Sequence, residues 1–463
     1  MRRWTAPTRE LAVLLAMLLA GCGAAPGPSS AGPPAPLSSV SLPSRAPTPS
    51  GTIFPGLGGV TPAPGSSSAL YSPNPGAIVV AIDPGHGGCL DWGVPNPYDN
   101  TLAKSEKADT LAIGLDLRDR LRAQGVTVVM TRTADVALAG ADYPPLGCHD
   151  APWRDVNGDG QVGFGPGVPA NTNARDELSA RLDLANLVRA DVLVSIHINS
   201  MTQNGVVYKI AATESFYTDE TPWGTGPAAR LAQLVQASVV ASMGRAASGY
   251  RRQDRGIEAK NLYIVAPTSS TGRPGEPRRG ALMPSILTEV GSMSLPAESE
   301  LLASRQGREA AAAGIYDGLV RYFADRPLAA RIDALLPGGE AGIQPPVASG
   351  SGPPFWAPLI PGARGDRRVT VRLTNTGTQR WPTLQLAIGW FASAQPYLGM
   401  PPRVSPADVS LPSLAPGEST LLDLLLRPPN AQSRQVAWIT VTDGTRALSQ
   451  LGSPPLQLAT SGP

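Results

Sequence analysis

The sequence predicts an α/β domain with a mainly parallel sheet and helices on both faces, followed by a smaller all-β sandwich. In residues 77–325, short apolar runs alternate with longer segments of helical spacing, which is typical of βαβ units. From about Pro354 onward, short segments alternate apolar and polar side chains between Pro and Gly turns, which favours a β-sandwich at 353–463. A stretch rich in Pro, Gly and Ala at 326–352 is predicted to be a linker between them.

The first 22 residues of the 463-residue chain read as an export signal. Arg2 and Arg3 precede a short apolar run at 11–21 that is too short to span a bilayer as a helix. The run closes in Leu-Ala-Gly-Cys at Cys22, which resembles a bacterial lipoprotein signal. That resemblance implies cleavage before Cys22 and a lipid on its thiol, which would anchor the chain to a membrane. An ordinary secretory signal with an incidental cysteine is the alternative, and either signal exports the protein.

Residues 23–76 are rich in Pro, Ser, Gly and Ala and carry almost no charge, so they cannot bury a core. We expect a disordered tether between the anchor and the α/β domain. The formal net charge of the chain is only +2, and nothing in the composition favours a nucleic-acid partner, which would require a basic face.

The elements of the α/β domain follow from hydrophobic spacing. The run at 77–83 is apolar up to Ile82 and is followed by Pro-Gly, as expected for a strand buried on both faces. In 104–125, leucines recur near helical spacing and Gly125 can end the helix. By the same reasoning, further strands are expected at 126–132, 191–200, 261–266 and 284–291, and further helices at 173–190, 228–244 and 305–324.

The expected strands of the sandwich lie at 367–377, 384–391, 419–428 and 435–444. The segment "LTNTGTQRWP" resembles the Asn-Thr-Gly…Trp-Pro signature of bacterial immunoglobulin-like accessory domains. Tryptophans on sandwich strands usually belong to the core, and an exposed aromatic face for sugar binding is the alternative. Four of the eight tryptophans of the chain lie in this region: Trp356, Trp381, Trp390 and Trp438.

Three side chains that can bind metal or move protons follow or close predicted strands, namely His86, His197 and Glu289, and Glu106 opens the first helix. Sites in open parallel sheets form at the carboxyl ends of the strands, so these four could converge. Two histidines and one carboxylate with an open fourth position form a catalytic zinc arrangement, and the other glutamate can act as general base. Each has a structural alternative: a turn or strand-end histidine, an ordinary surface acid at a helix start for Glu106, and a buried ion pair for Glu289.

Five blocks occur in one order along the chain: "VVAIDPGHGG", "SEK", "MTRTAD", "LSARLDLANLVRADVLVSIHINS" and "SILTEVGSMS". Together they resemble the zinc-dependent N-acetylmuramoyl-L-alanine amidases, which are bacterial peptidoglycan hydrolases, over roughly residues 77–325. The resemblance implies Zn²⁺ held by His86, Glu106 and His197, with Glu289 as the catalytic glutamate. It also implies hydrolysis of the amide between the lactyl group of N-acetylmuramic acid and L-alanine. The protein would then be a lipoprotein that faces the cell wall and remodels it.

Several features depart from or add to that pattern. After Glu289 the family commonly continues Gly-Phe, whereas this chain reads "VGSMSLPAE", so the rim of the cleft is altered. Glu106 follows His86 by twenty positions, which exceeds the usual family spacing. Arg181 and Asn186 match family positions of a structural kind. A cell-wall binding or regulatory protein with an inactive amidase domain is the alternative function.

An insertion at 134–175 carries two further predictions. Asp155, Asn157 and Asp159 follow the start of a calcium loop, so the 155–166 loop could bind Ca²⁺, although Pro166 replaces the usual bidentate Glu. A surface loop rich in Asx turns is the alternative. Cys89 and Cys148 could form a disulfide in an exported protein, or remain two free thiols. His149, the third histidine of the chain, is predicted to be a loop residue, and the alternative is that it reaches the zinc or the substrate from this insertion.

Overall fold

The computed structural model describes residues 77–88, 92–94, 104–135, 178, 181–182, 184–186, 188–203, 206–265, 281–336, 339–340, 359–360, 366–392, 403–430 and 435–460. All of them belong to one unit, Val60–Pro463. Among these residues no helix is both long and apolar enough to cross a membrane. Several predictions fall on residues outside these ranges and stay predictions: the signal at 1–22 with Cys22, the tether at 23–76, Cys89, Cys148, His149, and the calcium loop with Asp155, Asn157 and Asp159.

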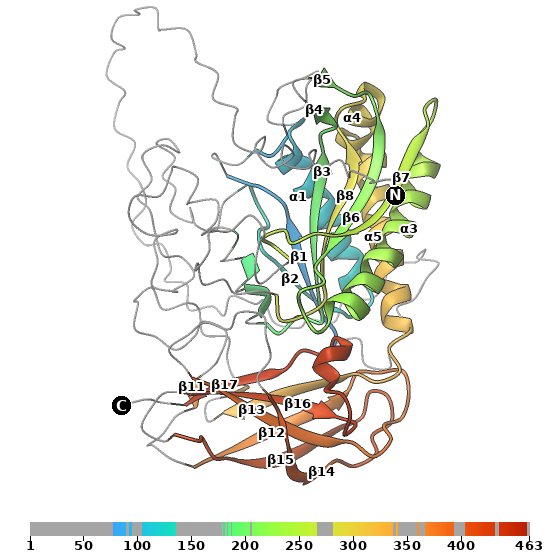
Figure 1. Cartoon of the computed structure of the whole chain (residues 1–463). Coiled ribbons are helices and arrows are strands. Elements are labelled where there is room, and N and C mark those ends of the chain that lie inside the picture. Colours follow the sequence, from blue (N-terminus) through green and yellow to red (C-terminus); the bar gives the residue numbers. More distant parts are fainter. Residues whose placement is uncertain are drawn as a thin grey trace, which may run out of the picture. The chain divides into compact units, whose positions relative to one another are not determined.

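A six-stranded sheet in the order β2-β1-β3-β8-β6-β7 forms the centre of the first region (Figure 1). The strands β1, β2, β3 and β8 are parallel, β6 is antiparallel to β8, and β7 is parallel to β6. The sheet is therefore mixed but mainly parallel, and the predicted α/β class is confirmed. The strands are β1 Val79–Pro84, β2 Thr127–Met130, β3 Val192–Asn199, β6 Ala211–Tyr217, β7 Arg252–Ala259 and β8 Ser285–Ser292.

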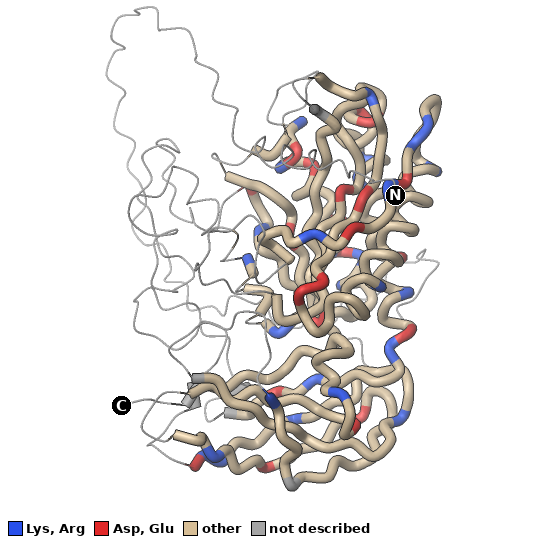
Figure 2. Tube along the Cα trace, viewed as in Figure 1, with Lys and Arg blue, Asp and Glu red and all other residues tan. Residues whose placement is uncertain are grey.

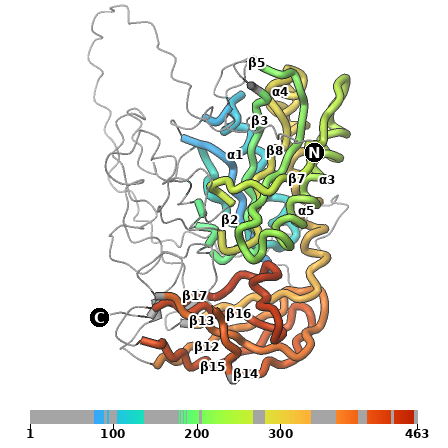
Figure 3. Tube along the Cα trace, viewed as in Figure 1, coloured from blue at the N-terminus to red at the C-terminus, as the bar shows by residue number. Residues whose placement is uncertain are grey.

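Three long helices cover one face of this sheet, as Figure 3 shows: α1 Glu106–Arg122, α3 Ala229–Ala246 and α5 Arg305–Ala324. Because side chains alternate along a strand, Val80 and Ile82 of β1 pack with these helices, whereas Val79 and Ala81 face the other side. There they join Leu182 and other residues from the segment predicted as a helix at 173–190, whose described residues between 178 and 186 are helical.

Two strands of the sheet were not expected, and one expected strand is absent. The strand β6 contains buried Thr213, Glu214 and Ser215, whose polarity hides the strand from a hydrophobic pattern. The strand β7 lies at the sheet edge and most of its side chains are exposed. The strand prediction at 261–266 is wrong, because 261–265 form a turn that buries Ile264 and Val265 without ladder pairing. Also unpredicted are α4 Pro296–Ala303, the short π-helix Gly224–Ala228, β4 Thr202–Gln203 and β5 Val206–Val207.

The C-terminal region consists of two sheets, with the orders β10-β9-β12-β15 and β11-β17-β16-β13-β14. All pairings are antiparallel except β11 with β17. Residues of both sheets, including Val371, Leu386 and Ile439, belong to one hydrophobic cluster. The strands are β9 Ala330–Leu336, β10 Gly339–Glu340, β11 Leu359–Ile360, β12 Arg367–Asn375, β13 Gln385–Ala392, β14 Ser405–Ser410, β15 Ser419–Leu426, β16 Gln435–Thr442 and β17 Leu456–Thr460; a 3₁₀ turn covers Leu448–Leu451.

The tryptophans of this region follow the core interpretation where they are described. Trp381 and Trp438 are fully buried, and Trp390 is partly buried against the same cluster that holds Trp381. The indole of Trp381 donates a hydrogen bond to the carbonyl of Ala329. Trp381 and Trp438 therefore cannot offer an open aromatic face to a sugar.

The structure differs from the predicted linker 326–352 in its first part. Residues 330–336 form β9, which pairs with β12 from Thr370↔Leu335 to Asn375↔Ala330. Ile332 and Ala334 point into the hydrophobic cluster of the C-terminal sheets, while Arg331 and Asp333 alternate with them. The period-2 pattern is there in "ARIDALL", but it is short and is surrounded by Pro and Gly.

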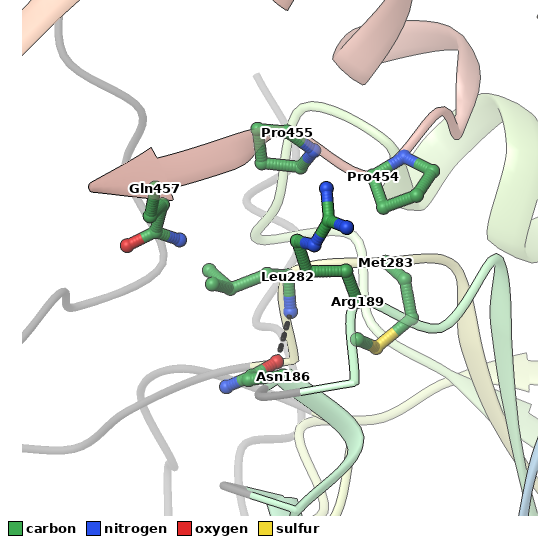
Figure 4. Close-up of a pocket in the computed structure, with 7 residues that line it drawn as sticks. All are labelled: Asn186, Arg189, Leu282, Met283, Pro454, Pro455 and Gln457. Atoms are coloured by element: carbon green, nitrogen blue, oxygen red, sulfur yellow. Dashed lines mark hydrogen bonds between the residues drawn. The ribbon is translucent and has the colours of Figure 1, made fainter. Parts of the chain in front are cut away.

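A small pocket, none of whose lining residues belongs to the predicted site, lies beside β17, and Figure 4 shows its lining. The side-chain oxygen of Asn186 accepts a hydrogen bond from the backbone N–H of Leu282 there, at 2.9 Å. This contact gives Asn186 a structural role, as the sequence resemblance implied. The lining residues are Asn186, Arg189, Leu282, Met283, Pro454, Pro455 and Gln457.

Candidate metal centre

Three predicted ligands, His86, Glu106 and His197, lie together although each comes from a different element. His86 lies in the turn after β1, Glu106 begins α1, and His197 lies in β3. One carboxylate oxygen, Glu106 Oε1, is 3.0 Å from His86 Nε2 and 3.1 Å from His197 Nδ1. The candidate ligand atoms of the three residues lie within 4.8 Å of one another, so they could hold a metal ion. Two imidazole nitrogens and a carboxylate oxygen are a donor set that zinc prefers.

The parallel pairing of β1 with β3 explains why two histidines that are distant in sequence meet. Pro84 is in register with Ile196, and the N–H of Gly85 donates to the carbonyl of Ile196 at 2.9 Å. The chain then turns sharply, and His86 itself adopts a left-handed conformation with φ of 61°. Such a conformation is uncommon for a residue with a side chain, so surrounding contacts must hold it.

Two buried arginines hold this turn through its carbonyl groups. Arg181 donates to the carbonyls of Pro84 and His86 at 2.9 and 2.8 Å. Arg132 donates to the carbonyls of Pro84 and Gly85, both at 2.9 Å. Five fixed donors on each guanidinium suit this task. Arg181 thus has the structural role that its sequence position implied, whereas Arg132 was not singled out from the sequence.

Asp83, at the end of β1, anchors the same arginine. Its carboxylate accepts hydrogen bonds from Arg181, Thr131 and Ser195 at 2.8, 2.6 and 2.7 Å, and it is 1% exposed. Burial alone would raise the pKa of Asp83, but the charge of Arg181 and the two hydroxyl donors lower it below its usual value. Asp83 therefore stays ionised and orients the arginine that supports His86.

Glu106 is almost fully buried, and both of its oxygens are in use. Besides the two imidazoles, Oε1 accepts the backbone N–H of Ile198 at 2.9 Å, and Oε2 accepts that of Val94 at 2.7 Å. Burial tends to raise the pKa of Glu106, but the neighbouring His86 and His197 outweigh it and lower the pKa below its usual value. The surface-acid alternative for Glu106 is thus excluded, because its side chain is 3% exposed.

Glu289 lies in β8 directly in register with His197, and paired residues on neighbouring strands project from the same face of a sheet. Its Oε2 is shielded from solvent and has no hydrogen-bond partner among the described residues. Burial, followed by the charge of Glu106, raises the pKa of Glu289 well above its usual value. A shielded carboxyl without a committed partner can hold or release a proton beside the three ligand-type side chains.

Glu214 is a further acid beside the site that the sequence did not single out. It lies in β6 in register with Glu289, and it is 8% exposed. Its Oε2 is 3.1 Å from Nε of Arg255 in β7. A glutamate between Thr and Ser in a short segment gives a weak signal, and β6 itself was not predicted.

Comparison with known proteins places this geometry in a family. The family model described as N-acetylmuramoyl-L-alanine amidase matches residues 80–321. The germination-specific N-acetylmuramoyl-L-alanine amidase of Bacillus subtilis is 24% identical over 248 residues, which are 54% of this chain and 81% of that protein. An N-acetylmuramoyl-L-alanine amidase of Neisseria meningitidis is 28% identical over 285 residues, 57% of this chain and 56% of that protein.

Among solved structures, the N-acetylmuramoyl-L-alanine amidase from Clostridium difficile 630 is 27% identical, with a TM-score of 0.37, over 54% of this chain and 98% of that chain. The family match spans more than half of the present sequence and includes His86, Glu106, His197 and Glu289. The chain that brings these four side chains together therefore belongs to the N-acetylmuramoyl-L-alanine amidase family.

Proposed function

We propose that this protein is a zinc-dependent amidase that hydrolyses the bond between N-acetylmuramic acid and L-alanine in peptidoglycan, for remodelling of the cell wall. His86, Glu106 and His197 are the proposed zinc ligands, and Glu289 is the proposed catalytic acid and base. One observation supports this assignment above the others. A single Glu106 oxygen lies 3.0 and 3.1 Å from nitrogens of the two histidines, and the uncommitted Glu289 is in register with one of them.

The donor set fits zinc. Two imidazoles and one carboxylate leave room for a further ligand, as catalytic zinc sites require. The backbone at Gly93 lies close to this donor set. A side-chain carbon at that position would lie 2.4 Å from Glu106 Oε2, so only glycine fits there. When bound, zinc supplies a Lewis acid that polarises the scissile carbonyl and promotes deprotonation of water near neutral pH.

The protein's own groups transfer the proton and hold the proposed zinc ligands in position. Glu289 accepts the proton of the attacking water and passes it to the nitrogen of the leaving alanine, as its shielded and uncommitted Oε2 allows. Arg181 and Arg132 keep the His86 turn in place through its carbonyls. The Val94 N–H fixes the second oxygen of Glu106, so that Oε1 stays directed at the histidines.

The activity is tested by release of peptides that begin with L-alanine from purified peptidoglycan. The wild-type protein with zinc should release them. Glu289→Gln, which keeps the shape of the side chain but cannot accept the proton, should retain zinc and lose roughly 10²–10⁴-fold in rate. Absence of release from the wild type, with and without zinc, would favour the alternative of an inactive wall-binding protein.

The ligand assignment is tested by metal analysis. Purified His197→Ala should contain much less zinc than the wild type. His149→Ala is the matched control, because it removes the remaining histidine, which was predicted not to be a ligand. Equal zinc in wild type and His197→Ala would count heavily against the assignment.

We also propose that the chain is exported and held at the membrane through lipidated Cys22, with 77–325 as the catalytic domain and the C-terminal sheets as an immunoglobulin-like accessory sandwich. The shared hydrophobic cluster of the two sheets supports the sandwich. In cells, Cys22→Ala should move the protein from the membrane fraction to the soluble fraction. Retention in the membrane would argue for a different anchor.

A further inference from the structure

We propose that Arg255 forms a carboxylate-binding subsite for the stem peptide, beside the catalytic glutamate on the leaving-amine side. The proposal rests on the proposed amidase function and adds a specificity determinant to it. The ligand class is an acidic peptide, namely one whose residue next to the alanine carries a free carboxylate.

The first observation is a row of charged side chains across the sheet. His197 of β3 is in register with Glu289 of β8, and Glu289 is in register with Glu214 of β6. Residues opposite one another on neighbouring strands lie on the same face, so this row runs outward from the ligand-type histidine. Arg255 of β7 extends the row by its ion pair with Glu214, at 3.1 Å. Figure 2 marks both basic and acidic positions in this outer part of the sheet.

The second observation is an irregularity of the ladder at that point. The register between β6 and β7 shifts between Thr213 and Ser215, next to Glu214. On the β7 side, Gly256 has a φ of 77°, and its N–H donates to Asp254 Oδ1 at 2.9 Å. A bulge of this kind redirects a side chain, and bulges are frequent beside active sites. Here it directs Arg255 toward Glu214.

The third observation is that the arginine is held in place but has donors to spare. Its Nε contacts Glu214, which is its sole ion-pair partner in the described part of the chain. The side chain of Arg255 is 42% exposed, whereas that of Glu214 is 11% exposed. An arginine fixed through Nε presents its terminal N–H groups to solvent, and a guanidinium suits a carboxylate by two parallel hydrogen bonds. Glu214 thus positions the group that would bind the substrate.

The chemistry of the reaction gives the direction in which the peptide leaves. The group that protonates the leaving nitrogen must lie on the nitrogen side of the scissile carbonyl. With the histidines on one side of Glu289 and Glu214 on the other, the peptide extends from Glu289 toward β6 and β7. The sugar stays on the side of β3 and β1.

The distances match a nearby carboxylate of the peptide. Neighbouring strands are roughly 4.8 Å apart, so the guanidinium beside Glu214 lies about 5–10 Å from Glu289. A peptide advances roughly 3.3–3.6 Å per residue, so the carboxylate of the residue after alanine falls within that reach. Lys260, exposed at the end of β7 with its ammonium 4.7 Å from the Phe216 ring centroid, adds positive charge to the same side.

The test compares two N-acetylmuramoyl dipeptides whose second residue carries either free carboxylates or the corresponding primary amides, with the zinc-loaded full chain. The wild type should prefer the acidic substrate by about tenfold or more in kcat/KM, mainly through KM. Arg255→Ala should lose this preference, so that the ratio between the two substrates approaches one. Arg251→Ala, which removes another exposed arginine just before β7, is the matched control and should keep the preference.

Two outcomes would overturn the proposal. One is an acid-to-amide ratio in Arg255→Ala that equals that of the wild type. The other is an equal loss on both substrates, which would mean a structural role; thermal unfolding of each variant identifies that case. If the wild type hydrolyses neither substrate and releases no peptide from purified peptidoglycan, the proposed amidase function fails by itself. In that case, calorimetry measures the affinity of the protein for acidic and amidated dipeptides that begin with alanine. Tighter binding of the acidic dipeptide by the wild type, lost in Arg255→Ala, supports the subsite. Equal binding of both dipeptides by the wild type overturns it.

Discussion

Gly93 shows how closely the site is built at the scale of single residues. It has a φ of 68°, and a side-chain carbon added to it would lie 2.4 Å from Glu106 Oε2 and 2.6 Å from His86 Cδ2. The segment between His86 and Glu106 returns here over the carboxylate that both histidines share. Gly249 has a similar φ of 78°, but nothing lies within 4 Å of the added carbon.

These two glycines give a matched pair of substitutions. Gly93→Ala and Gly249→Ala should each destabilise the fold by about 1–2 kcal/mol, because both impose a left-handed conformation on alanine. Only Gly93→Ala should also lower zinc content and amidase activity, because only there does the new methyl group displace Glu106 and His86. Equal zinc binding and activity in the two variants would contradict the close approach. Chemical denaturation and metal analysis measure the two effects separately.

Asp109 is a buried acid in α1, one turn beyond Glu106, and its two oxygens have no hydrogen-bond partner among the described residues. Its nearest cation is Arg308, at 3.7 Å. Burial, with a smaller contribution from Glu106 and opposed by Arg308, raises the pKa of Asp109 to about 7. Because the native pKa exceeds the unfolded value of 3.8, the native state binds the extra proton between these values. The resulting stabilisation is full below about pH 4 and is lost as the pH rises through 7.

Asp109→Asn should therefore raise the free energy of unfolding at pH 8 by about 1–3 kcal/mol and flatten its decline between pH 4 and 7. Asp119→Asn, at an exposed position of the same helix, should change stability by no more than about 0.5 kcal/mol. Urea unfolding across this pH range measures both. If the free energy of unfolding declines equally steeply with pH in wild type and Asp109→Asn, Asp109 does not cause that decline.

At the scale of elements, α5 and α3 approach each other through glycine. A side-chain carbon on Gly318 of α5 would lie 2.6 Å from the Cα of Val235 in α3, and one on Gly314 would lie 2.6 Å from the Cα of Val239. The Ala- and Gly-rich sequence of α5 thus allows α5 and α3 to pack closely together. Both helices lie on the face of the sheet that α1 also covers.

Gly318→Ala should destabilise the protein by about 1–3 kcal/mol, because the two helices must separate or shift to admit the methyl group. Gly244→Ala is the matched control in the exposed last part of α3, where nothing lies within 4 Å of the added carbon. It should stabilise by about 0.5–1 kcal/mol through helix propensity alone. Thermal unfolding distinguishes them, and equal shifts in both variants would argue against the close contact.

The elements also show where sequence patterns were informative. Helices α1, α3 and α5 have apolar residues near helical spacing and strands β1, β3 and β8 have short apolar runs, and these elements occur close to where they were expected. Strands β6 and β7 have neither pattern, because β6 buries polar residues that hydrogen-bond within the fold. Ser215, for example, donates to Gln236 at 2.9 Å. The segment 261–266 has the apolar pattern but does not form a strand, because side chains can be buried against other elements without the backbone pairing in a sheet.

At the scale of the whole molecule, β9 changes where the C-terminal region begins. Ile332, which is 1% exposed, and the pairing with β12 assign 330–336 to the C-terminal sheets rather than to a linker. A fragment that begins at residue 353 lacks a neighbour for β12 and leaves part of its hydrophobic cluster open.

A fragment of residues 330–463 should therefore unfold cooperatively and at a higher temperature than one of residues 353–463. The loss of Ile332 burial alone is worth about 1.5–3 kcal/mol, and the lost ladder adds to it. Circular dichroism of the two fragments during heating measures the difference. Identical unfolding temperatures would show that β9 contributes nothing to the C-terminal region.

The sequence by itself determined the α/β class, most of its long helices and apolar strands, the amidase resemblance, and the candidates His86, His197 and Glu289 at strand ends and Glu106 at a helix start, because apolar spacing and ordered motifs are local properties. Only the tertiary structure brought His86 and His197 to one carboxylate oxygen of Glu106 and aligned Glu289 with His197. It alone revealed the arginines beneath the His86 turn and the Glu214–Arg255 pair. These depend on strand order and register, which join residues far apart in the chain and leave no local pattern.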